Sequence, residues 1–280
     1  MRRWEAIRSG LKNVSEQQTV TALNQAHWNR VSAQYAKASR LFAPEELLLE
    51  TFRDQLPTWT MLDVGIGAGR TTMHFAPACR SYSGLDYAPT MVGQARRNCP
   101  DYAERLMVAD ACDLNGYASE SFDFVLFSFN GLDCIAPADR KRALGEIRRV
   151  LRPGGIFAFS SHNLDSVPMP GHWPMPPLTR TKPLQTAYRL LQRARRNQRI
   201  RPLVRQMNLT QAHERGWACF ADGGESYEVP LVYVTMAFQR AQLKEAGFGL
   251  FSVQDRDCRE VPEQPGSCDS WLYYLAKRTS

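Results

Sequence analysis

The sequence has no apolar run long enough to cross a membrane: nothing in its 280 residues approaches the roughly 18–20 apolar residues that a spanning helix needs. Its basic first residues, 1–5, lead into a polar stretch, so we expect no secretory signal. The seven cysteines include no CxxC pair, which argues against a metal site or a disulfide framework. An odd number of dispersed thiols is typical of a reducing compartment, and we therefore expect a cytoplasmic protein without a metal ion.

Acidic residues are missing from one long segment. Residues 166–213 contain nine lysines and arginines but no aspartate or glutamate, so this segment accounts for the whole net charge of +7. For the basic run at 189–205 three interpretations stay open: a solvated helix face, a guide for anionic substrates such as a nucleotide sugar, and peripheral contact with an anionic membrane. Few aromatics interleave with these arginines, so we do not expect a nucleic-acid partner.

The central part of the chain alternates short β-like runs with amphipathic stretches. This rhythm is typical of a parallel sheet that helices cover on both faces. A helix is expected from about 137 to 151, ending at the Pro-Gly-Gly break, and another from 233 to 246, closed by Gly247. Strands are expected at 60–64, 82–86, 105–110, 122–129, 156–160, 248–253 and 270–276.

The rhythm fails at both ends of this region. Residues 1–56 precede the first strand and form a helical N-terminal extension, with a break predicted at Pro44. Residues 57–280 form one α/β domain, in which 164–232 are an insertion after the fifth strand. Such an insertion lies over the carboxyl edge of the sheet, so we expect it to act as a substrate lid. Tyr233, which follows it, is one of the aromatics expected to line the substrate site, with packing in the lid's own small core as the alternative.

A glycine-rich turn connects the first strand to the next helix. Gly65, Gly67 and Gly69 follow the Gly-x-Gly-x-Gly spacing, which lets the backbone approach a ligand, although a tight turn alone also explains it. A nicotinamide dinucleotide site requires Gly-x-Gly-x-x-Gly, and Arg70 occupies the third glycine position of that pattern. A nicotinamide oxidoreductase is therefore the least supported function.

Aspartates follow the second and third strands. Asp86 lies 21 positions after Gly65, where a carboxylate can accept both hydroxyls of a ribose, and Asp110 ends the next strand. Each also has a simpler interpretation as a helix cap. Because open parallel sheets bind ligands at the carboxyl ends of their strands, a glycine turn and two aspartates at successive strand ends favour a nucleoside site.

Together these motifs resemble the class I S-adenosylmethionine-dependent methyltransferases. The resemblance covers about 57–162 and 233–277, and it implies a Rossmann-like, doubly wound, seven-stranded sheet whose last strand is antiparallel. It also implies S-adenosyl-L-methionine as the cofactor. The matching segments are Leu-Asp-Val-Gly-Ile-Gly-Ala-Gly (62–69), Gly-Leu-Asp-Tyr-Ala-Pro-Thr-Met (84–91), Val-Ala-Asp-Ala (108–111), Phe-Asp-Phe-Val (122–125), Val-Leu-Arg-Pro-Gly-Gly (150–155) and Leu-Lys-Glu-Ala-Gly-Phe (243–248).

The resemblance further assigns parts of the cofactor to residues of this chain. Asp86 is implied to bind the ribose, and Ser128 to line the side where the methyl group is delivered. Tyr35, in a Trp…Tyr pattern of the N-terminal helix, is implied to close over the cofactor. The methionine part is implied to be framed by Asp63, Gly65, Gly67 and Gly69, and the adenine to be flanked by Tyr87 and Met91 and held at its edge by Asp110 and Ala111.

A sulfonium methyl group is already activated, so such an enzyme mainly aligns the acceptor and excludes water. A base is required only when the acceptor atom holds a proton. His162, directly after the fifth strand, is the first candidate, because its ordinary pKa suits this task, although a His that only caps a loop is an alternative. Asp133 is the second candidate, with helix capping as its alternative. Asn130 and Asn163 are expected to orient a polar substrate.

Three functions remain in competition. The first is a methyltransferase for a small polar molecule with an oxygen or nitrogen acceptor, sugar-like or anionic. The second is an RNA methyltransferase, which salt-dependent RNA retention through the 189–205 arginines would favour. The third is a non-catalytic sensor or scaffold, which cofactor binding without turnover would favour. The sequence carries no indication of the oligomeric state.

Overall fold

A computed structural model describes residues 16–167, 191, 208–221, 230–263 and 269–280. The basic run at 189–205 and most of the expected lid therefore lie outside the described residues, apart from Leu191. Within the described ranges, no helix is both long and apolar enough to span a membrane. The division into an N-terminal extension, a domain and a lid remains a prediction.

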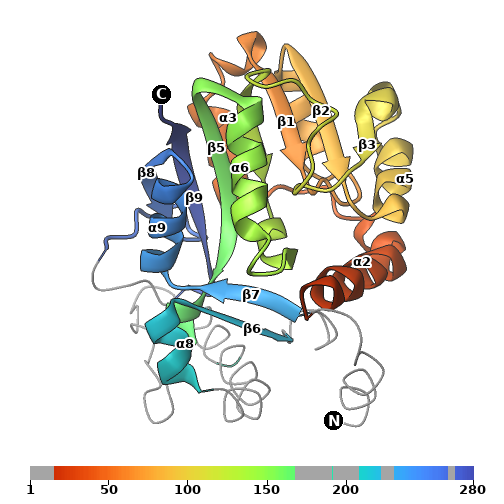
Figure 1. Ribbon diagram of the computed structural model, residues 1–280. Coiled ribbons are helices and arrows are strands. Elements are labelled where there is room, and N and C mark those ends of the chain that lie inside the picture. The colour runs from red at the N-terminus through yellow and green to blue at the C-terminus, as the bar shows by residue number, and fades with distance from the viewer. Residues whose placement is uncertain (1–15, 168–190, 192–207, 222–229, 264–268) are drawn as a thin grey trace.

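A central β-sheet organises the chain (Figure 1). Five parallel strands follow the order β3-β2-β1-β4-β5, and the antiparallel β9 joins β5 on its other side and carries β8. This confirms the predicted doubly wound α/β fold with an antiparallel last strand. The strands are β1 (Thr60–Val64), β2 (Ser81–Asp86), β3 (Leu106–Val108), β4 (Phe122–Phe127), β5 (Leu151–Asn163), β8 (Phe248–Gln254) and β9 (Trp271–Arg278).

Helices cover both faces of this sheet and bury a separate core on each. On one face, α6 inserts Ala143, Leu144 and Ile147, spaced to share one side of the helix, against Phe157 and Phe159 of β5. The other face packs around Phe75, Tyr82 and Phe124 beneath the helices that precede or follow β1 and β2. The helices are α3 (Ala43–Thr51), α4 (Thr72–Phe75), α5 (Pro89–Asn98), α6 (Arg140–Val150) and α9 (Met236–Glu245).

Two further strands extend the sheet, so the described part of the chain holds nine strands and not the predicted seven. β7 (Pro230–Val234) runs parallel to the last residues of β5, and β6 (Trp217–Ala221) pairs with it antiparallel. His162 pairs with β9 on one side and with β7 on the other. β4 ends at Phe127, and beyond that point β7 pairs with the same edge of β5.

The prediction of a helix beginning at Tyr233 was wrong. Tyr233 belongs to β7, and α9 begins at Met236, because the Thr235 hydroxyl accepts the Phe238 backbone N–H at 3.1 Å and caps the helix. The helix after the glycine loop is short. It consists of α4 and the 3₁₀ turn Ala76–Ala78.

The N-terminal region lies against the carboxyl edge of the sheet. The long helix α2 (Glu16–Tyr35) runs below α5 and reaches toward β7 (Figure 1). Asn24 Nδ2 fixes it there by donating to the carbonyl oxygens of Cys134 and Pro230, at 2.9 and 3.0 Å. Pro44 lies in the first turn of α3, where its missing N–H is tolerated, so it begins a helix and does not interrupt one.

Candidate active site

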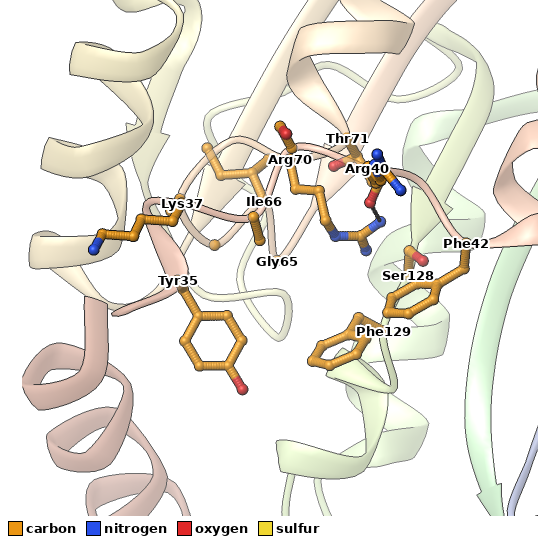
Figure 2. A pocket seen from close by; sticks show the side chains of 14 residues that line it. Tyr35, Lys37, Arg40, Phe42, Gly65, Ile66, Arg70, Thr71, Ser128 and Phe129 are labelled. Carbon is orange, nitrogen blue, oxygen red and sulfur yellow. Dashed lines mark hydrogen bonds between the residues drawn. The ribbon is translucent and has the colours of Figure 1, made fainter. Parts of the chain in front are cut away.

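A cavity of about 430 Å³ opens at the carboxyl ends of β1 and β4 (Figure 2). The glycine loop forms one side, and Ser128 and Phe129 at the end of β4 form another. The chain between α2 and α3 closes the cavity from a third direction, with Tyr35 and Phe42 at its limits. The expected cofactor loop and the expected methyl-delivery side therefore share one cavity.

The three glycines of the loop all have positive φ, but their surroundings differ. A Cβ on Gly65 would lie 2.8 Å from the Phe127 ring, and one on Gly69 would lie 3.3 Å from Ala95 of α5. A Cβ on Gly67 would meet nothing within 4 Å, since this glycine borders the open cavity. Gly65 and Gly67 line the cavity, whereas Gly69 packs the loop against α5.

Asp86 ends β2 directly beneath this loop. Its carboxylate accepts the backbone N–H groups of Gly67 and Ala88, at 2.9 and 2.8 Å, and it is only 6% exposed. Burial raises the pKa of Asp86 to about 6, and the two backbone donors oppose that rise. A carboxylate oriented in this way keeps lone pairs for further donors. Together with the open face of Gly67, this arrangement fits a ribose.

Asp63 is buried behind the residues that line the cavity. Its Oδ2 accepts the hydroxyls of Thr71 and Tyr82, at 2.5 and 2.7 Å, and burial raises its pKa to about 7. Because Thr71 follows the glycine loop, these bonds attach the end of the loop to β1 and β2. Asp63 does not line the cavity, and its contact with the methionine part stays a prediction.

The residues expected around the adenine lie beyond the cavity lining. Asp110 is exposed, and its Oδ1 accepts the Cys112 backbone N–H at 2.9 Å. Met91 is buried in a small cluster with Ala68 and Tyr35, so it connects α5 to the loop and to α2. Ala111 is buried and Tyr87 half-buried. The adenine contacts of these residues remain predictions.

An ion pair that the sequence did not indicate borders the same cavity. Glu45 of α3 is fully buried and pairs with Arg70, whose Nη2 donates to Oε1 at 2.7 Å. Glu45 also accepts the Ser128 hydroxyl and, at 2.7 Å, the Phe42 backbone N–H. One carboxylate thus joins the start of α3, the glycine loop and the end of β4. Glu45 was missed because its partners are distant in sequence.

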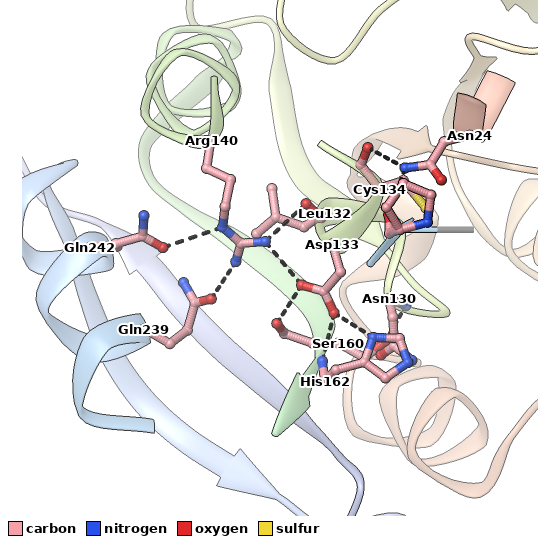
Figure 3. Close-up of polar contacts among 12 residues, drawn as sticks. Asn24, Asn130, Leu132, Asp133, Cys134, Arg140, Ser160, His162, Gln239 and Gln242 are labelled. Atoms are coloured by element: carbon pink, nitrogen blue, oxygen red, sulfur yellow. Dashed lines mark hydrogen bonds and ion pairs between the residues drawn. The ribbon is translucent and has the colours of Figure 1, made fainter. Parts of the chain in front are cut away.

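The two predicted catalytic residues meet at the same sheet edge (Figure 3). Asp133 lies in the 3₁₀ turn Gly131–Cys134 after β4, and His162 lies near the end of β5. His162 Nδ1 is 2.8 Å from Asp133 Oδ2, which also accepts the His162 backbone N–H at 2.6 Å. A carboxylate at Nδ1 favours the tautomer whose Nε2 is unprotonated. This arrangement suits a general base.

A buried network fixes the Asp133 carboxylate. Its other oxygen, Oδ1, accepts Arg140 Nη1 at 2.9 Å and the Ser161 hydroxyl at 2.6 Å. Arg140 is 1% exposed and donates in turn to Gln239 of α9, at 2.7 Å. Asp133 is therefore oriented from α6, α9 and β5 together. No such bonds would be needed for a residue that merely caps a helix.

The three predicted substrate residues have different positions. Asn130 is nearest to the dyad, with Nδ2 3.3 Å from His162 Nε2. Tyr233 is buried and stacks on His162, with ring centroids 4.6 Å apart, so it lies behind the imidazole. Asn163 caps a 3₁₀ turn by accepting the Asp165 N–H, and its Nδ2 donates to the Asp269 carbonyl. Substrate contact by these residues stays a prediction.

Comparison with known proteins identifies the central part of the chain. Residues 62–159 match the family model described as a methyltransferase domain. The chain is 32% identical over 114 residues to the ubiquinone/menaquinone biosynthesis C-methyltransferase UbiE of Geotalea daltonii, covering 38% of this chain and 47% of that protein. It is 33% identical over 106 residues to the human thiol S-methyltransferase TMT1B, covering 36% and 42%. The chain thus spans about half the length of the curated relatives it matches.

Solved structures share the fold over nearly the whole chain. The 1,6-didemethyltoxoflavin-N1-methyltransferase of Burkholderia thailandensis, solved with S-adenosylhomocysteine, aligns with a TM-score of 0.60 and 15% identity, covering 95% of this chain and 92% of that one. A methyltransferase from Clostridium acetobutylicum aligns with a TM-score of 0.56 and 14% identity, covering 90% and 99%. Residues 62–159 therefore match the methyltransferase domain, and the chain shares the fold of these S-adenosylmethionine-dependent methyltransferases.

Proposed function

We propose that this protein transfers the methyl group of S-adenosyl-L-methionine to an oxygen or nitrogen atom of a small polar acceptor, and that His162 is the general base. The observation that carries the proposal is the 2.8 Å contact between His162 Nδ1 and the buried Asp133 carboxylate. A base is needed only for acceptors that hold their proton, such as a hydroxyl or an N–H group. We also propose a cytoplasmic location, from the dispersed cysteines.

The positions of the residues support a separate role for each group in the proposed reaction. The cofactor supplies an activated methyl group, and the glycine loop and Asp86 are proposed to hold its nucleoside and methionine parts. Asp133 holds the imidazole in one orientation and stabilises it once it is protonated. Arg140 and Ser161 keep the carboxylate in place, and the carboxylate in turn fixes the orientation of the imidazole.

The named relatives do not decide the acceptor atom, since one is a C-methyltransferase and another a thiol S-methyltransferase. A hydroxyl or N–H acceptor is favoured here by the dyad itself. Methyl transfer to a thiol depends less on a base, because a thiol has an ordinary pKa of about 8.5 and ionises more readily than a hydroxyl. The dyad also favours an enzyme over a sensor or scaffold, which would require cofactor binding alone.

The test is methyl transfer from labelled S-adenosylmethionine in a cell extract, with the product identified by mass spectrometry. We expect a low-molecular-weight product carrying an O-methyl or N-methyl group. A nuclease-sensitive labelled polymer would support RNA methylation instead. Cofactor binding without any labelled product across a broad acceptor panel would support a sensor and contradict the proposal.

A further inference from the structure

An aromatic wall joins the cofactor cavity to the Asp133–His162 dyad. Phe42 and Phe129 lie with parallel rings, centroids 5.3 Å apart, and Trp271 meets both edge-on at 5.2 and 5.4 Å. Tyr35 approaches Phe129 from α2, at 6.3 Å. These aromatics come from α2, the start of α3, β4 and β9. Such convergence produces an apolar surface whose flat part is the parallel pair Phe42 and Phe129.

Phe129 is held in this wall by an unusual backbone. Phe129 and Asn130 have φ values of +53° and +59°, in the left-handed region that bulky residues rarely adopt. Strain of this kind costs roughly 1–3 kcal/mol and concentrates at functional sites. Its effect here is to present the Phe129 ring to the cavity, where the residue remains 37% exposed despite its size. A ring that served only packing would not need that conformation.

The wall and the base are neighbours. Asn130, next to Phe129 in the chain, places Nδ2 3.3 Å from His162 Nε2. Trp271 is the antiparallel partner of His162 in β9, so both side chains project from the same face of the sheet. An acceptor lying on Phe129 would thus have its reacting edge next to the imidazole.

The polar groups around the wall complete the site. Arg70, which pairs with Glu45, lies 4.6 Å from the centroid of the Phe42 ring and 5.7 Å from that of Phe129, and Arg256 lies 5.9 Å from that of Trp271. Asn130 Oδ1 is buried and has no hydrogen-bond partner among the described residues. A buried amide oxygen without a donor is costly, and a polar hydrogen on a ligand would satisfy it.

From this arrangement, and resting on the proposed methyltransferase function, we propose that the acceptor is a planar aromatic or heteroaromatic molecule that carries a hydroxyl or ring N–H group. Its ring stacks on Phe129 and its edge faces His162. The acceptor's lone pair forms the new bond to the methyl carbon as the S–C bond breaks and sulfur keeps that electron pair. The acceptor proton passes to His162 Nε2. A sugar has no flat apolar face of comparable size for this wall.

The test compares 2-naphthol with its saturated analogue decahydro-2-naphthol, which has the same carbon skeleton and hydroxyl. Each is titrated by calorimetry into protein already saturated with S-adenosylhomocysteine. We expect 2-naphthol to bind roughly three- to tenfold more tightly, the scale of an aromatic stacking contact. The variant F129L, titrated at a concentration of S-adenosylhomocysteine that saturates this variant, should abolish the preference. F251L removes a Phe on β8 that is 53% exposed, and it should leave the preference intact.

Equal affinity for the two alcohols, or an unchanged preference in F129L, would overturn the inference. If F129L fails to fold, W271L provides the same comparison from β9. A titration with S-adenosylhomocysteine alone, before either alcohol is added, separates the two proposals. If S-adenosylhomocysteine does not bind, the methyltransferase assignment itself is contradicted. Intact binding without aromatic preference contradicts only the acceptor class.

Discussion

The two halves of the sheet's carboxyl edge are built in different ways. The proposed cofactor half, at the ends of β1 and β2, is built around two short contiguous segments, the loop 65–71 and residues 86–88. The acceptor half, at the ends of β4 and β5, draws its groups from α3, the turn after β4, β5, β7 and β9. Only the first half can be recognised from local motifs, because its proposed ligand contacts are made largely by the backbone and by one carboxylate.

This difference implies that the two halves respond separately to mutation. Changes around Asp86 should alter cofactor affinity, and changes around His162 should alter the rate of transfer. Glu45 is the exception, since its carboxylate contacts Arg70 of the loop and Ser128 of the acceptor half.

The variant H162Q should slow methyl transfer by about 10²–10⁴-fold, the usual contribution of a positioned general base. S-adenosylhomocysteine affinity, measured by calorimetry, should stay within twofold because His162 lies outside the cofactor half. The matched control is H213Q, which removes a histidine that contacts a different carboxylate, Asp165, at 3.6 Å. Full activity in H162Q would remove His162 as the base.

The variant R140L should destabilise the protein by about 3–5 kcal/mol, since it leaves the fully buried Asp133 carboxylate without its charged partner. Denaturant unfolding provides the measurement. R142L, two positions along the same helix, removes an exposed arginine and should change stability by no more than about 0.5 kcal/mol. Equal losses of stability in R140L and R142L would show that the Asp133 network does not stabilise the acceptor half.

The variant D86A should weaken S-adenosylhomocysteine binding by about 1–3 kcal/mol, the scale for a lost buried hydrogen bond to a charged group. D101A removes an exposed aspartate and is the matched control. Unchanged affinity in D86A would contradict the ribose assignment. A loss of affinity in D101A of the same size would point to a general charge effect.

Cofactor affinity should also fall as the pH is lowered through about 6, by up to about tenfold per pH unit. The reason is that Asp86 then becomes protonated and loses its capacity to accept both hydroxyls of the ribose. The pH dependence that Asp86 gives to folding stability has the opposite sign. A carboxyl whose pKa is raised from 3.8 to about 6 stabilises the fold below pH 3.8 and loses that contribution as the pH rises through 6. Calorimetric titrations between pH 5 and 8, repeated with D86N, should show the step only in the unmodified protein.

Much of the fold was predictable because each strand before residue 162 carries its own pattern. The β1 turn and the strand-end Asp86 are local features, and their positions follow from sequence. The extension by β6 and β7 was not predicted. The run Pro230–Val234 is apolar, but its first three residues were assigned to the insertion and its last two to the helix predicted at 233–246, although Thr235 already provides a helix cap. Pairing with the end of β5 decides that these residues form a strand.

The candidate active site was less predictable than the fold, because single residues could be identified but their contacts could not. His162 and Asp133 were each identified from their positions after strands, yet their contact depends on the turn that Asn130 begins in a left-handed conformation. Glu45 could not have been found, because a Glu in the first turn of a helix is ordinary in sequence. Its role depends on Arg70 and Ser128, which lie 25 and 83 residues away.

The central claim is that both halves face one methyl group. A crystal structure of the complex with S-adenosylhomocysteine tests it most directly. The account predicts the ribose hydroxyls on Asp86 and the thioether sulfur turned toward His162 across Phe129. A nucleoside bound elsewhere, or a sulfur directed away from the Asp133–His162 dyad, would contradict it.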